Sequence, residues 1–297
     1  MAETNLSTPE LNQFFHSYIE EELASSERNI AAFANDVYNL TDIKGQRYVM
    51  RVLKDQLPET VQTEAIMQHK LTEAGIRTPA YIELNDGSYV GIQDGTSFTL
   101  SKYIEGEVPK TASLELVADF GATLAKLHTS LNGVSISPNK MQWFNLKNAK
   151  ADFDAYDGPL KEKLTYLIGS GERLFGINLP KAVTHGDLWL GNVFAEGDKV
   201  TAVFDLETAE YTYRIIDLAR TYLSMRMETG YASKDLIEHL FNGYNSVATT
   251  PLTAEERQNF GIATAYVASV CATWHAVHNT KYSGPYVGFG EEALAAK

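Results

Sequence analysis

The stretch VTHGDLWLGNVF, residues 183–194, sets polar side chains in a short turn between apolar flanks. Asp187 and Asn192 lie five residues apart in it, and Asp205 follows at the end of the apolar run VTAVFDLE, residues 200–207. Carboxylate and amide oxygens are hard ligands, which suit Mg²⁺ and suit Zn²⁺ poorly. The spacing therefore predicts that these two carboxylates and one amide point into a shared cavity.

A division of roles follows from the coordination habits of Mg²⁺. The ion takes one or two protein carboxylates and completes its octahedron with phosphates and waters. A metal held by Asn192 and Asp205 would leave room for ATP as co-substrate. Asp187 would then accept a proton from a hydroxyl group. We therefore expect a Mg²⁺–nucleotide site with a proton acceptor beside it.

Composition sets the wider bounds. With 297 residues, the chain is expected to form one large domain or two lobes. The net charge of −13 argues against nucleic acid or an anionic membrane as partner. The acidic excess fits a cationic ligand, although solubility alone also explains it. A single cysteine, Cys271, and a start without a signal-peptide pattern favour a cytoplasmic protein, and no apolar run is expected to span a membrane.

Hydrophobic periodicity predicts an α+β fold with two lobes. A helix over residues 7–23 and another starting at Pro58 frame an N-terminal lobe that covers residues 1–101. The stretches that read as its five strands are 33–42, 45–53, 80–84, 88–93 and 97–104. Residues 102–297 are mainly helical, and Thr253 with Glu256 forms a capping box for the last long helix.

The order of motifs resembles a known family. HGDLWLGN followed by FDLE is similar to the catalytic and metal-binding segments of the aminoglycoside phosphotransferase, choline kinase and homoserine kinase family. Further landmarks lie in the order of that family, and they are YVMRV, TEAIMQHKLTEAGIRTP, YIEGE, FGATLAKLH and YRIIDLART. The resemblance implies a bilobal protein-kinase-like fold, with an antiparallel five-stranded sheet in the N-terminal lobe and a larger helical C-terminal lobe.

The resemblance also implies a nucleotide site. Arg51, positioned by Glu64, would hold the α- and β-phosphates, and the backbone around Lys102 and Ile104 would bind adenine. Arg51 stands where protein kinases carry Lys, and its planar fork can grip two phosphate oxygens. The segment AFANDVYN, at the place of the phosphate-covering loop, has no glycine, and the chain has no Gly-Lys pair, which excludes a Walker A loop.

Two further residues support the catalytic loop by the same resemblance. The ring of His185 would bond neighbouring backbone, and Asp217 would anchor the loop through backbone N–H groups. An acid or metal-ligand role for His185, and a third-ligand role for Asp217, are the alternatives.

The acceptor is expected to be a small hydroxyl compound that carries an amine. Glu207 and Glu210 follow the metal-binding aspartate, and Trp189 supplies an aromatic wall. Carboxylates beside aromatic rings suit an ammonium group. A solvated acidic surface with core aromatics is an equal alternative. An amino alcohol, an amino sugar or aminoglycoside, and a homoserine-like amino acid all stay open.

Two other classes of function compete with a kinase. A catalytically silent, kinase-like nucleotide-binding protein would lack one of the three key residues, and all three are present. A metal-dependent hydrolase would use His185, Asp187 and Asp205 and would need more ligands close by. The pair His275 and His278 lies on an expected apolar helix and fits packing or capping. The oligomeric state is left open.

Overall fold

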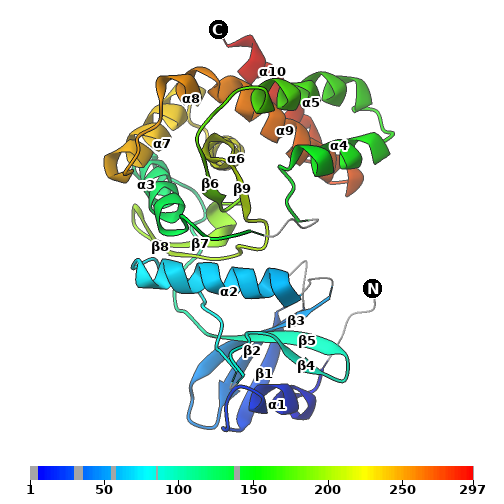
Figure 1. Ribbon diagram of the computed structural model, residues 1–297, viewed down its shortest axis with the longest axis vertical. Coiled ribbons are helices and arrows are strands. Elements are labelled where there is room, and N and C mark those ends of the chain that lie inside the picture. The colour runs from blue at the N-terminus through cyan, green and yellow to red at the C-terminus, as the bar shows by residue number, and fades with distance from the viewer. Residues whose placement is uncertain (1–5, 30–35, 55–57, 85, 137–140, 297) are drawn as a thin grey trace. The chain divides into compact units, whose positions relative to one another are not determined.

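The computed structural model describes residues 6–29, 36–54, 58–84, 86–136 and 141–296 (Figure 1). The chain divides into two compact units, Met1–Glu105 and Gly106–Lys297, and each is described by itself. The predicted α+β class is confirmed, since the first unit carries a sheet and the second is mainly helical.

The first unit is built on a five-stranded antiparallel sheet in the order β1-β2-β3-β5-β4. Its strands are β1 (Leu23–Asn29), β2 (Asp36–Asp42), β3 (Arg47–Leu53), β4 (Gly91–Gln93) and β5 (Thr96–Lys102). Side chains alternate between the two faces of a strand, so Met50 and Arg51 point to opposite sides. Met50 is buried in a core with α1 (Thr8–His16), and Arg51 faces α2 (Pro58–Glu73).

The beginning of the chain differs from the prediction. The first helix ends at His16, not at Leu23, because the backbone N–H of Leu23 donates to the side chain of Asn12 and the chain turns back into β1. Strand β1, LASSERN, was not predicted. Its residues are mostly exposed at the edge of the sheet, so they carry no apolar alternation.

The strand predicted over residues 80–84 is also wrong in extent, since only Tyr81 forms an isolated bridge, to Ser101. Side chains of α2 replace the missing ladder: Gln68 accepts from Tyr81 N at 3.0 Å, and the ring of His69 lies 3.0 Å from Tyr81 O.

The sequence Asn85-Asp86-Gly87 is typical of a hairpin turn, and the chain does turn there, since Leu84 N donates to Ser88 O at 2.8 Å. Asn85 itself falls outside the described residues. The observed hairpin joins β4 to β5 through Asp94 and Gly95, which have φ angles of 50° and 77°. Two consecutive left-handed residues are the requirement of a tight hairpin turn, and aspartate and glycine meet it.

The second unit consists of helices around two short two-stranded sheets (Figure 1). Strand β6 (Lys181–Thr184) pairs with β9 (Glu210–Tyr213), and β7 (Val193–Glu196) pairs with β8 (Lys199–Val203). The helices are α3 (Leu114–Ser130), α4 (Leu146–Ala155), α5 (Lys161–Phe175), α6 (Arg214–Glu228), α7 (Ser233–Val247), α8 (Ala254–Gln258), α9 (Phe260–Val277) and α10 (Ser283–Ala295).

The C-terminal helices correct two expectations. The capping box of Thr253 and Glu256 caps the short helix α8, and α9 begins after a break at Asn259. Glu256 is fully buried, and its charge is compensated by the guanidinium of Arg214, which its carboxylate binds at 2.7 and 2.8 Å. Helix α10, which follows α9 and packs against it, was not predicted.

Helix α9 is the core helix of the second unit and contacts α5, α6 and α10. It spans 18 residues with a mean hydropathy of 1.3, so by length and composition alone it would cross a membrane. This corrects the expectation that no apolar run is long enough. Within the described residues, 67% of this helix is buried, as is typical of a helix in a protein core.

Candidate active site

The loop after β6 is shaped by Gly186, which lies in the left-handed region at φ 83°. A Cβ atom at this position would stand 2.6 Å from the backbone oxygen of Thr208, closer than any real contact. Glycine is therefore the residue that lets the chain turn here between Thr184 and Asp187. The hydroxyl of Thr208 also donates to His185 O at 3.0 Å and closes the turn.

Asp217 holds this turn from α6. Its carboxylate accepts from His185 N at 2.7 Å and from Gly186 N at 2.9 Å, and it lies 2.9 Å from Nε2 of His128. The side chain is fully buried. Burial by itself would raise the pKa of Asp217, but the bond to His128, the neighbouring imidazoles and the N–H donors lower it overall. Asp217 is thus an ionised anchor for the loop.

His185 connects two segments of the site. Its Nδ1 accepts from Asp187 N at 3.2 Å, so Nε2 carries the proton and donates to Phe204 O at 3.0 Å. Burial lowers the pKa of His185 against the pull of Asp217 and Asp187, which keeps the ring neutral. Because Phe204 directly precedes Asp205, the ring joins the Asp187 loop to the segment that carries the second aspartate.

Asn192 also links the Asp187 loop to the segment that carries Asp205. It ends the short 3-10 helix Leu190–Asn192, and its Nδ2 donates to Asp187 O at 2.9 Å and to Asp187 Oδ2 at 3.3 Å. Its backbone oxygen accepts from Phe204 N at 3.1 Å. Asp205 has a φ of 71°, which is uncommon for a residue other than glycine. The structure therefore brings Asp187, Asn192 and the Asp205 segment together.

Sequence reasoning missed one member of the site, Arg220. Its Nη2 lies 2.6 Å from Oδ1 of Asp187, and both side chains are largely buried. Nη1 of Arg220 is buried and has no hydrogen-bond partner in the part of the chain that the structure describes. A signal was present, because Arg220 is one helical turn after Asp217 in YRIIDLART and so shares its face of α6.

Thr221 completes that face of α6, since its hydroxyl donates to Leu188 O at 2.8 Å. Asp217, Arg220 and Thr221 stand at positions i, i+3 and i+4 and bind successive parts of the loop from residue 185 to 188. One helix face thus fixes the backbone and the carboxylate of Asp187 together.

The residues expected to meet the acceptor lie in the second unit. The indole of Trp189 packs over Gly191, where a Cβ atom would meet the ring at 2.3 Å. Glu207 and Glu210 are both buried. Burial raises the pKa of Glu210 to about 7, although a bond to Asn145 opposes the shift. Among the described residues, Oε2 of Glu210 has no hydrogen-bond partner.

The residues expected to bind nucleotide lie in the first unit. Nη1 of Arg51 binds Oε1 of Glu64 at 3.0 Å and also contacts the hydroxyl of Tyr81. Lys102 is the last residue of β5, and Ile104 follows two residues later. The fold of the first unit thus brings Arg51 and Glu64 together.

The donor set fits a hard divalent cation. Asn192 turns its amide nitrogen to Asp187, which leaves its amide oxygen as a donor beside the Asp205 segment. No group of three or more His, Cys, Asp and Glu residues that would hold a metal is found in the described ranges. The hydrolase alternative, which needs such a group, therefore gains no support.

The sheet, the helices and the loop on α6 together define a protein-kinase-like phosphotransferase fold. The chain belongs to the phosphotransferase enzyme family (APH), whose model matches residues 27–255. The resemblance inferred from the motifs is confirmed by this match.

Curated relatives include homoserine kinases. The chain is 27% identical to the homoserine kinase of Sinorhizobium fredii over 267 residues, which cover 85% of this chain and 79% of that protein. It is 25% identical to the homoserine kinase of Zymomonas mobilis over 271 residues, covering 86% and 82%.

Solved structures with the same fold include two phosphotransferases. An amicoumacin kinase in complex with AMP-PNP and Ca²⁺ has a TM-score of 0.73 at 16% identity, covering 90% of this chain and 87% of that one. A putative aminoglycoside phosphotransferase from Ralstonia eutropha has a TM-score of 0.69 at 17% identity, covering 98% and 99%.

Proposed function

We propose that the protein is a kinase that transfers the γ-phosphoryl group of ATP to a hydroxyl of a small, amine-bearing molecule, with Mg²⁺ as the metal. The observation that carries this proposal is the position of Asn192. Its side chain bonds Asp187, and its backbone bonds the residue before Asp205. A proton acceptor and two oxygen ligands are thereby supported by one network.

Asp187 is the residue assigned to the acceptor hydroxyl. Its carboxylate is held from two sides, by Arg220 on Oδ1 and by Asn192 on Oδ2. A fixed carboxylate orients the attacking oxygen and takes its proton as the bond to phosphorus forms. The rate then comes mainly from positioning, because phosphoryl transfer asks for little covalent chemistry from the protein.

Asn192 and Asp205 are the residues assigned to Mg²⁺. Asn192 and Asp205 would hold the ion, which would supply positive charge against the phosphates. The chain contributes a neutral and an anionic oxygen there, and it keeps Asp187 out of the ligand set by its contacts with Arg220 and Asn192.

Arg51 and the backbone of Lys102 and Ile104 are assigned to ATP. Glu64 is almost fully buried, and its ion pair with Arg51 fixes the direction of the guanidinium. A guanidinium whose direction is fixed suits planar contact with phosphate oxygens.

The acceptor is assigned from the second unit and from the relatives. Glu207 and Glu210 with Trp189 supply two acids and one aromatic ring, which suit an ammonium group. The curated relatives are named homoserine kinases, and homoserine carries both a hydroxyl and an amine. An amino alcohol or an amino sugar offers the same pair of groups.

The proposal also places the protein in the cytoplasm. A chain with a single cysteine fits this reducing compartment, in which ATP is available.

A coupled assay of nucleotide consumption tests the proposal. Homoserine, ethanolamine, choline, amino sugars and aminoglycosides are each offered with ATP, with and without Mg²⁺, to the wild type and to Asp187→Asn. We expect one class of acceptor to give a phosphorylated product that requires Mg²⁺ and Asp187. Binding of ATP without transfer to any acceptor would instead support the silent nucleotide-binding alternative.

A further inference from the structure

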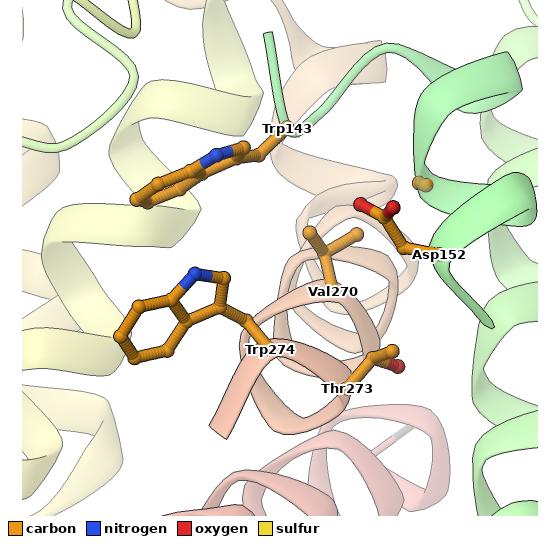
Figure 2. Close-up of a pocket in the computed structure, with 6 residues that line it drawn as sticks. Trp143, Asp152, Val270, Thr273 and Trp274 are labelled. Carbon is orange, nitrogen blue, oxygen red and sulfur yellow. The ribbon is translucent and has the colours of Figure 1, made fainter. Parts of the chain in front are cut away.

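Two indole rings form a small pocket in the second unit, apart from the catalytic loop. Trp143 precedes α4 and Trp274 lies on α9, and their ring centroids are 6.1 Å apart with 36° between the planes. Figure 2 shows the two rings one above the other, with a gap beside them. The outer face of Trp274 is covered by the ring of His278, stacked at 4.1 Å. Both indole rings line the pocket.

An acid faces the same space. Asp152, on α4, lines the pocket with Ala149, Val270 and Thr273, and in Figure 2 its carboxylate points toward the indoles. Partial burial raises the pKa of Asp152, as expected for a carboxylate near apolar walls without a compensating cation. The pocket has room for a group of the size of a water molecule. A primary ammonium has that size.

Helix α9 carries pocket-lining residues and also Cys271, which is within electrostatic reach of Arg220 and Asp187. Cys271 stands between the lining residues Val270 and Trp274. Burial raises the pKa of the Cys271 thiol to about 11, and the charges of Arg220 and Asp187 also act on it. The step from Cys271 to Trp274 is about 4.5 Å along a helix.

We infer that Trp143, Trp274 and Asp152 form the subsite for a primary ammonium group of the acceptor substrate. The inference rests on the proposed function, and it assigns the ammonium group to this pocket in place of the group formed by Glu207, Glu210 and Trp189. The indole faces attract a cation, and the carboxylate supplies a charge partner. The alternative is that both rings only pack α4 against α9.

Direct binding without nucleotide tests the subsite independently of catalysis. The probe is 3-aminopropan-1-ol, and its control is butan-1-ol, in which a methyl replaces the ammonium. We expect saturable quenching of tryptophan fluorescence by the amine and none by the alcohol. Trp143→Leu, observed through Trp274, is expected to weaken binding about 2- to 30-fold.

Asp152→Asn provides a variant that keeps the fold, because the residue is exposed. It is expected to weaken binding of the amine about three- to ten-fold. Asp154→Asn is the matched control, since Asp154 is an exposed acid on the same helix that does not line the pocket. Equal effects of both variants would show general attraction by the acidic segment and would overturn the inference.

The remaining outcomes separate the subsite from the proposed function. Equal binding of amine and alcohol, or no saturable quenching by the amine in the millimolar range, overturns the subsite even if phosphoryl transfer is found. Amine binding that depends on Asp152, without any transfer from ATP, keeps the subsite and refutes the kinase. With an active acceptor, Asp152→Asn is expected to raise KM for that amine and leave kcat unchanged.

Discussion

The guanidinium of Arg220 lies 2.6 Å from the carboxylate of Asp187, and both groups are largely withdrawn from solvent. A buried ion pair of this kind holds two charges in place, and removal of one partner leaves the other uncompensated. The ion pair therefore fixes the position of the Asp187 carboxylate.

Arg220→Met is expected to lower kcat about 10- to 100-fold and to leave KM for ATP unchanged, since the Asp187 carboxylate loses one of its two fixed contacts. Arg220→Lys should restore part of kcat, because a cation returns without the fork. Steady-state kinetics check this. Arg226→Met is the control, because Arg226 on the same helix binds the exposed Glu292. Equal loss in both variants would indicate damage to α6.

Asp187→Asn is expected to lower kcat by roughly 10²–10⁴-fold, the usual worth of a positioned general base. The melting temperature is expected to fall, because the buried guanidinium of Arg220 loses its charge partner, while the fold is retained; thermal denaturation followed by circular dichroism checks both. Asp94→Asn, in the exposed turn between β4 and β5, is the control for loss of one carboxylate. Full activity of Asp187→Asn would remove Asp187 from the mechanism.

Asp217→Ala is expected to cost about 2–4 kcal/mol of unfolding free energy, because the N–H groups of His185 and Gly186 and the ring of His128 lose their acceptor. The folded-state pKa of Asp217 is lowered, so its contribution is present above the usual carboxyl range and is lost as the pH falls. Urea unfolding at several pH values measures both effects. A variant whose acid unfolding matches the wild type would contradict the assignment.

Glu210→Gln is expected to stabilise the protein in mildly alkaline buffer, by up to about 3 kcal/mol. The pKa of Glu210 is raised to about 7 in the folded chain, so the wild type loses stability as the pH rises from the usual carboxyl range through 7. The glutamine variant has no such loss. The difference between the two unfolding free energies should vanish near pH 4. A constant difference across this range would refute the shifted pKa.

Gly186→Ala is expected to cost about 3 kcal/mol or more and to reduce activity, because the new Cβ would press against Thr208 O in a left-handed conformation. Gly197→Ala isolates the conformational part, since Gly197 has a φ of 55° with nothing within 4 Å of a Cβ. That control should cost about 1 kcal/mol. Similar losses in both variants would show that the contact with Thr208 is unimportant. Chemical denaturation compares them.

Local patterns carried much of the fold. Strand β3 and helix α2 were predicted because alternation and helical spacing are written in consecutive residues, and the ion pair of Arg51 and Glu64 follows from their facing sides. The grouping of Asp187, Asn192 and Asp205 came from spacing and from the resemblance of motifs. Their assignments to base and metal stay predictions.

Contacts between segments that are distant in the sequence could not be predicted from local patterns. Strand β1 is polar because it lies at an edge, and Tyr81 gives up its ladder because side chains from α2 bind its backbone. Arg220 was overlooked for a similar reason, since its partner is 33 positions away and becomes visible only when the 3.6-residue repeat is drawn for α6.

Asp217, Arg220 and Thr221 all bind one loop from the same face of α6. The number of residues between them therefore decides whether all three contacts can form. One inserted residue between Asp217 and Arg220 would swing everything after it by about 100° around the helix axis and slide it by about 1.5 Å. The arginine would then point away from the carboxylate while the aspartate still held the turn. Insertions and deletions are therefore to be accommodated outside this turn of helix, in the connections that follow Glu228.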